Sequence, residues 1–219
     1  EQNFREPHHW NQSIMLFHPQ GWNAKWIKQV FTKLVEHHDA LRMTYHVSNG
    51  QVQQEIRGLD GDFFTFQIFN LCGKKHIRSE IEQRANRLQQ NHRLNGGPLI
   101  QLGLFQTDEG DHLLIVIHHL LIDGVSWRIL LEDFMIGYKQ LEQQREIRLV
   151  PKTTSYQQWA SALWKYAHSE QLQKELRYWR QIVRIGASKL PVDRQPLGLL
   201  QMKDTKNIFG KLKLIISKK

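Results

Sequence analysis

Hydrophobic and polar positions follow two different periods along the chain, which predicts strands mixed with helices. Apolar runs of strand length, alternating or continuous, fall at residues 10–17, 41–47, 51–56, 63–69, 99–106 and 112–117. Apolar residues spaced three or four apart predict helices near residues 23–38, 74–91, 125–144, 156–168 and 170–184. Short turns such as Asn49-Gly50 join some neighbouring strands, and longer crossovers join others. This mixture predicts a layered α/β or α+β domain.

The pattern changes near the end of the chain. From Leu190 the sequence becomes irregular, with Pro191 and Pro196, and residues 208–216 alternate like a strand with no obvious partner. The late strand and the abrupt start at Glu1 suggest a fragment of a larger protein. We predict a main subdomain at 1–189, followed at 190–219 by a linker and the first strand of a subdomain missing from this chain.

Composition narrows the class of protein. The formal charge is +9, from 30 Lys and Arg against 21 Asp and Glu, but the basic residues are scattered and densest at 174–184. No zinc-finger spacing or RNP-like strand accompanies them, so we expect an acidic protein partner or a solvated surface rather than nucleic acid. No apolar run approaches the ~20 residues of a membrane helix. Cys72 is the single cysteine, and no signal peptide opens the chain, which fits a reducing cytoplasm.

The candidate catalytic residues lie at the end of an apolar strand, at His118 and His119. A short loop with Asp123 and Gly124 follows, and then a helix. Neighbouring strand residues point to opposite faces, so one histidine should face a crevice and the other should pack inward. Ligands of α/β sheets bind at such strand ends, and an imidazole there suits general-base work. We expect Gly124 to free the backbone for a tight turn, and Asp123, if buried, to need a partner.

Interpretations other than catalysis stay open for these histidines. Adjacent histidines at a strand end are often packing or surface residues. The spacing from His119 to Asp123 could suggest metal ligands, but the loop would not align them and a third ligand at motif spacing is lacking, so we expect no metal. The remaining histidines are expected at the surface or at helix caps; these are His8-His9, His37-His38, His92 and His168.

The segment His118 to Gly124 resembles the HHxxxDG motif of the condensation-domain superfamily of nonribosomal peptide synthetases. Residues 37–45 are similar to that family's second motif, RHExLRTxF, and Tyr178-Trp179 with Leu-Pro-Val-Asp at 190–193 resemble its junction into the second subdomain. These landmarks occur in the family's order and span most of the chain. The resemblance implies a chloramphenicol acetyltransferase-like fold, an α+β two-layer sandwich, of which this chain is the N-terminal half.

Finer details resemble the epimerization subtype, namely residues 125–133 after the Asp-Gly pair and residues 7–13. An epimerization domain inverts the α-carbon of an aminoacyl or peptidyl thioester. The alternatives are a condensation domain that forms peptide bonds, a catalytically silent scaffold that binds carrier protein, and an unrelated acyltransferase of the same fold.

The resemblance also implies roles for individual residues. His119 falls on the catalytic position and His118 on a supporting one, while Asp123 matches a structural aspartate paired with Arg42, and Gly124 is the turn residue. N–H groups of the following helix are a candidate donor to the thioester oxygen.

The resemblance implies partners as well. No cofactor is bound directly, since the substrate hangs on the 4′-phosphopantetheine arm of a peptidyl carrier protein. The other partners are neighbouring synthetase domains and the C-terminal subdomain, which supplies an opposing glutamate. We therefore expect this chain alone to be inactive or very weak.

Overall fold

The computed structural model describes residues 7–49, 51–94 and 96–186. The chain divides into two compact units, one ending at Trp164 and the other beginning at Lys165. Within the described residues no helix is both long and apolar enough to cross a membrane.

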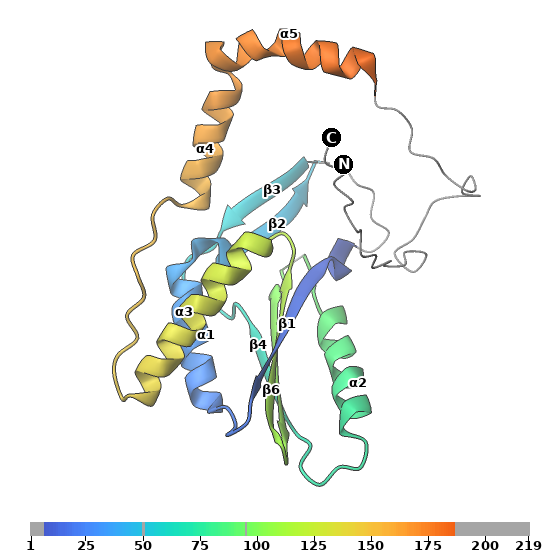
Figure 1. Cartoon of the computed structure of the whole chain (residues 1–219), viewed down its shortest axis with the longest axis vertical. Helices are drawn as coiled ribbons and strands as arrows, with labels where there is room; N and C mark the ends of the chain where they lie inside the picture. Colours follow the sequence, from blue (N-terminus) through green and yellow to red (C-terminus); the bar gives the residue numbers. More distant parts are fainter. Residues whose placement is uncertain (1–6, 50, 95, 187–219) are drawn as a thin grey trace, which may run out of the picture. The chain divides into compact units, whose positions relative to one another are not determined.

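A four-stranded sheet forms the centre of the first unit (Figure 1). Its order is β1 (Asn11–His18), β6 (Gly110–His118), β5 (Ile100–Thr107) and β4 (Thr65–Asn70). β6 runs antiparallel to both neighbours, whereas β4 and β5 are parallel. The two inner strands, β5 and β6, are buried along nearly their whole length, which explains the unbroken apolar run at 113–117 in β6.

Helices cover both faces of this sheet (Figure 1). α1 (Ala24–His37) and α3 (Gly124–Glu142) pack against the face that carries Leu113, Ile115 and Ile117. α2 (Ile77–Gln90) packs against the opposite face, with Leu114 and Val116. The α/β class is thus confirmed, and α2 adds a layer on the second face. Alternating side chains of one strand serve two separate cores.

Smaller elements complete the first unit. They are η1 (Pro7–His9), η2 (Asp39–Arg42) and the hairpin of β2 (Met43–Ser48) with β3 (Gln51–Ile56), which forms its own sheet. The strand predicted from residue 41 begins only at Met43, because the residues before it close a 3₁₀ turn after α1.

Two helices follow, α4 (Tyr156–Ala167) and α5 (Glu170–Ile185), with bounds close to the predicted ones. Ser169 caps α5 by accepting a hydrogen bond from the Leu172 amide. The strand predicted at 208–216 and the boundary predicted at 189/190 lie outside the described residues, so both stay predictions.

Candidate active site

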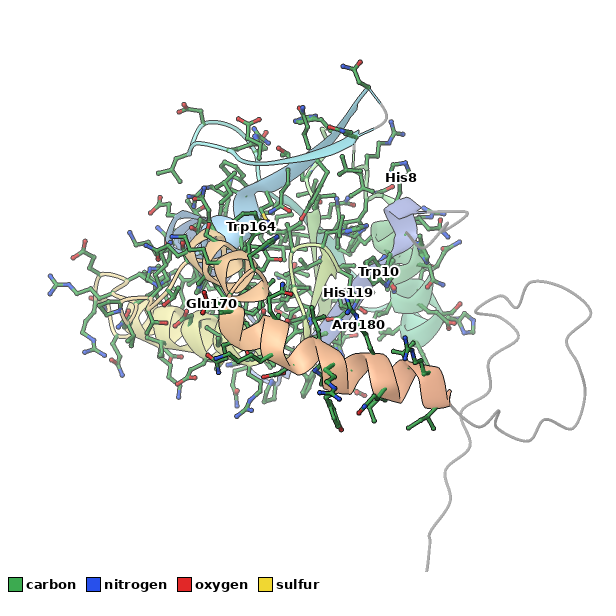
Figure 2. The ribbon with its side chains drawn as sticks, turned by 90° about the horizontal axis from the view of Figure 1, so that it is seen from above. His8, Trp10, His119, Trp164, Glu170 and Arg180 are labelled. Atoms are coloured by element: carbon green, nitrogen blue, oxygen red, sulfur yellow. The ribbon has the colours of Figure 1, made fainter. Side chains whose placement is uncertain are left out.

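β6 delivers both histidines to the open end of the sheet. The His119 amide donates to the Trp10 carbonyl at 2.8 Å, which continues the pairing of β6 with β1 by one residue (Figure 2). The Leu121 amide then turns back to the His118 carbonyl at 2.9 Å. The backbone at His119 is therefore held on both sides before the loop to α3 begins.

The two histidines face different environments, as strand geometry predicted. His118 is 1% exposed, and its Nδ1 accepts from the Leu120 amide at 3.2 Å. His119 is half-buried, and its ring lies 4.5 Å from the Trp10 ring, centroid to centroid. The inward histidine supports the loop and the outward one is available for chemistry.

Hydrogen bonds fix which nitrogen of His119 carries the proton. Nδ1 lies 3.0 Å from the Ile122 carbonyl oxygen, which can only accept, so Nδ1 is the protonated nitrogen. Nε2 lies 3.0 Å from the Gln12 amide nitrogen, which can only donate, so Nε2 carries the lone pair. These hydrogen bonds fit the His119 tautomer with its proton on Nδ1 and its lone pair on Nε2.

Trp127 in turn fixes the orientation of Gln12. The indole Nε1–H of Trp127 donates to Gln12 Oε1 at 2.8 Å, which leaves the amide NH₂ of Gln12 facing His119. The chain of donors thus runs from Trp127 through Gln12 and His119 to Ile122. Sequence reasoning missed Gln12 and Trp127, although both lie in stretches that resemble the epimerization subtype.

Asp123 closes the loop as the N-cap of α3. Its Oδ1 accepts from the Ser126 hydroxyl at 2.7 Å, the Ser126 amide at 2.8 Å and the Val125 amide at 3.1 Å. The Ser126 hydroxyl contributes most to lowering the pKa of this carboxyl below its usual value. The carboxylate is solvent-exposed, and its partners come from the first turn of the helix.

The expected ion pair between Asp123 and Arg42 is wrong. The guanidinium of Arg42 instead donates to the backbone carbonyls of Val35 and Glu36, near the end of α1, and to that of Arg57. The last carbonyls of a helix lack partners within the helix, so a cation there satisfies them. Arg42 therefore ties α1 to the β2–β3 hairpin, and Asp123 is satisfied without it.

Gly124 also differs from expectation. It is the first residue of α3, it is not among the glycines with positive φ, and a Cβ placed on it would meet nothing within 4 Å. The turn is made by Asp123, whose extended backbone (φ −133°, ψ 179°) is that of a helix N-cap. The tight turn expected at Gly124 is therefore wrong, and the residue leaves open space beside Asp123.

A double-mutant cycle distinguishes the two pairings of Asp123. Because Asp123 and Arg42 have separate partners, the stability losses of Asp123→Ala and Arg42→Met should add within about 0.5 kcal/mol. Asp123→Ala alone should cost about 1 kcal/mol as a lost cap. Urea unfolding of the two single variants and the double variant measures this. The cycle of Asp123→Ala with Ser126→Ala is the matched control and should show coupling; strong coupling to Arg42 instead would contradict the N-cap assignment.

Other histidines are less ordinary than the sequence suggested. His38 does cap α1, but its Nε2 also lies 2.7 Å from the Asp133 carboxylate of α3. His92 is only 1% exposed, and its ring lies 6.2 Å from that of His118. Desolvation by burial is the largest cause that lowers the pKa values of His37 and His92 below 6.5.

These lowered pKa values predict a loss of stability in mild acid. The unfolded chain binds a proton at His92 more readily than the fold does, so the free energy of unfolding should decrease as pH falls below about 6.5. One proton contributes at most about 1.4 kcal/mol per pH unit. Urea midpoints between pH 7.5 and 5 measure the slope. His92→Leu should flatten it, whereas the exposed control His46→Gln should not; an unchanged slope in His92→Leu would contradict the assignment.

Comparison with known proteins identifies the class. Residues 1–209 match the model of the Condensation domain family, so the chain belongs to that family. It is 46% identical over 182 residues to gramicidin S synthase 1 of Brevibacillus brevis, and 45% identical over 192 residues to tyrocidine synthase 2 of Brevibacillus parabrevis. These alignments cover 83% and 87% of this chain but only 17% and 5% of the two relatives. Both relatives are nonribosomal peptide synthetases.

Solved structures refine the family assignment. The chain matches the epimerization domain from the third module of tyrocidine synthetase B with a TM-score of 0.86 and 42% identity, over 89% of this chain and 45% of that one. It matches the starter condensation domain of rhizomide synthetase with a TM-score of 0.71 and 15% identity, over 83% and 43%. The fold is chloramphenicol acetyltransferase-like, and the chain is similar to a little under half of that epimerization domain.

Proposed function

We propose that the chain is the N-terminal half of an epimerization domain, which inverts the α-carbon of an aminoacyl or peptidyl thioester. The observation that carries this proposal is the imidazole of His119, oriented through both ring nitrogens, in a chain 42% identical to an epimerization domain. The match to a condensation domain at 15% identity concerns the shared fold alone.

The proposed reaction uses the basic Nε2 of His119. This nitrogen takes the α-proton, the C–H electron pair moves into the carbonyl as an enolate, and an acid on the opposite face returns a proton to the α-carbon. Gln12 must release Nε2 before the proton arrives, because its NH₂ group occupies the lone pair in the resting site. Two groups are needed, since one base retracing its path would restore the starting isomer.

The enolate oxygen needs donors other than the first amides of α3. The Val125 and Ser126 amides already donate to Asp123 Oδ1, and the Trp127 amide donates to the Asp123 carbonyl at 3.0 Å. These three amides are therefore already engaged, which argues against the expectation that N–H groups of this helix bind the oxygen. We assign oxyanion stabilisation and the opposing acid, a glutamate, to the C-terminal subdomain.

The remaining expectations enter the proposal unchanged. The substrate is carried on the phosphopantetheine arm of a peptidyl carrier protein, and neighbouring synthetase domains and the C-terminal subdomain are partners. The boundary between the subdomains is proposed at 189/190, and the location is proposed to be cytoplasmic. The formal charge of +9 suits an acidic carrier protein.

A stereochemical assay tests the function. The complete domain, with its C-terminal half, is incubated with carrier protein loaded with an L-aminoacyl thioester, and the released amino acid is resolved by chiral chromatography. We expect a mixture of L and D isomers and uptake of one deuterium at the α-carbon from D₂O. Retention of the pure L isomer, with no deuterium uptake, in a preparation that binds carrier protein would overturn the proposal.

Condensation is the second candidate, because the matching family model is that of the Condensation domain. In that reaction His119 Nε2 would accept a proton from the amine that attacks the thioester. Adding a second, acceptor-loaded carrier protein to the same assay distinguishes the two functions. A dipeptidyl thioester of unchanged stereochemistry would favour condensation.

A further inference from the structure

A second histidine cluster, whose residues take no part in the His119 hydrogen-bond chain, joins the C-terminal end of α1 to α3. His37 is the last residue of α1, His38 is its C-cap, and Asp133 lies within α3. One potential ligand atom of each lies within 4.8 Å of the others. We call these three residues the His37–His38–Asp133 cluster.

The two imidazoles of the cluster can offer lone pairs. The His37 and His38 rings lie at the C-terminal end of α1, with centroids 4.8 Å apart and ring planes nearly perpendicular at 89°. A neutral imidazole carries a proton on one ring nitrogen and a lone pair on the other. Metal-binding histidines commonly donate the protonated nitrogen to a carboxylate, a backbone carbonyl or water, which fixes the tautomer and the ring orientation.

The carboxylate of the cluster supplies the negative charge. Asp133 is 7% exposed, and its Oδ2 lies 2.7 Å from His38 Nε2. The neighbouring charges Asp39 and Lys152 pair with each other at 3.2 Å and largely cancel. A buried carboxylate beside two imidazoles therefore leaves the cluster with a net negative charge when both rings are neutral.

We propose that the His37–His38–Asp133 cluster binds a divalent transition-metal ion of the zinc type. Two imidazole nitrogens and one carboxylate oxygen form a ligand set typical of such ions, whereas Mg²⁺ and Ca²⁺ prefer oxygen ligands alone. The ion takes the place of the proton between His38 and Asp133, and that proton is released or moves to His38 Nδ1. Water completes the coordination, and no redox step is involved.

Binding requires the ligand atoms to move in both directions, because pairs up to 4.8 Å apart must close while the shortest contact opens. Tetrahedral zinc with ligands at about 2.0 Å holds neighbouring ligand atoms about 3.3 Å apart, so the 2.7 Å contact must open by several tenths of an ångström. The ion would link the C-terminal end of α1 to the middle of α3, which begins at the loop that carries His119. Because only the folded chain brings these ligands together, binding should stabilise the fold.

Calorimetry on the metal-free chain tests the proposal. After treatment with a chelator, the full chain is titrated at pH 7.5 with Zn²⁺ and, separately, with Mg²⁺. We expect one Zn²⁺ per chain, a higher Tm with Zn²⁺, and no Mg²⁺ binding. Substituting Co²⁺ should give the visible absorption bands of a nitrogen–oxygen site. Failure to bind Zn²⁺ stoichiometrically would overturn the proposal.

The chain has twelve histidines, and variants distinguish binding at this cluster from adventitious binding at the others. His38→Gln and Asp133→Asn should each weaken Zn²⁺ binding at least tenfold, and the exposed control His46→Gln should bind like the parent chain. Equal affinity of the parent and the double variant His37→Gln/His38→Gln would contradict the assignment. If a variant does not fold, ¹⁵N-histidine NMR of the parent chain during the Zn²⁺ titration replaces it. Two ring systems should then shift at one equivalent, and gradual shifts spread over many histidines would contradict the site.

Discussion

Replacing His119 with alanine in the complete domain should lower the rate of α-proton exchange at least a hundredfold. General acid–base catalysis contributes roughly 10²–10⁴-fold, and His119 Nε2 is the basic atom that the hydrogen-bond chain prepares. The loss should fall mainly on kcat, because the imidazole acts on the reacting C–H bond rather than on the carrier protein.

Deuterium uptake from D₂O into the carrier-bound aminoacyl group measures this effect directly. The matched control is His46→Ala on the exposed β2–β3 hairpin, which should exchange at the parent rate. Added imidazole should restore part of the activity of His119→Ala, an outcome that a purely structural role would not give. Unchanged exchange in a folded His119→Ala domain would exclude His119 as the essential base.

Periodicity predicted most of the fold because burial follows it closely here. β5 and β6 lie between two helical layers, and both are rich in apolar residues on both faces. The parallel pairing of β4 with β5 was not predictable, because it depends on where α2 returns the chain to the sheet. The 3₁₀ turn at Asp39–Arg42 was not predicted either. Leu41 and Met43 show the alternation typical of a strand, but only Met43 belongs to the strand.

The candidate site was predicted in part. Strand geometry correctly predicted that one histidine faces inward and the other outward, but it did not predict which; the structure buries His118 and leaves His119 partly exposed. The N-cap role of Asp123 could have been predicted from its position just before a helix. The family resemblance instead led us to expect an ion pair between Asp123 and Arg42. Partners distant in sequence could not be predicted: Gln12 is 107 residues from His119, and His38 is 95 residues from Asp133. Local patterns specify elements, whereas such contacts arise from packing.

Gln12 should control the proton position on His119, and two substitutions separate this role from simple packing. Gln12→Leu removes the donor to Nε2, but that bond must break before proton transfer and the Ile122 carbonyl still holds the proton on Nδ1, so the exchange rate should change by less than roughly tenfold. Gln12→Glu places a carboxylate, which can only accept, against Nε2, so that nitrogen must carry a proton. A protonated Nε2 cannot remove the α-proton, and the loss should approach that of His119→Ala, roughly a hundredfold.

The tautomer itself provides a second measurement. In ¹⁵N NMR of the parent domain, His119 should show a protonated Nδ1 and a bare Nε2. The Nε2 signal should become that of a protonated nitrogen in Gln12→Glu but not in Gln12→Leu. Trp127→Phe is the matched control for the other side of the amide: it frees Gln12 Oε1, lets the amide turn over, and should give a mixture of tautomers with an intermediate rate. Equal rates and identical His119 spectra in Gln12→Glu and Gln12→Leu would mean that Gln12 acts through packing alone.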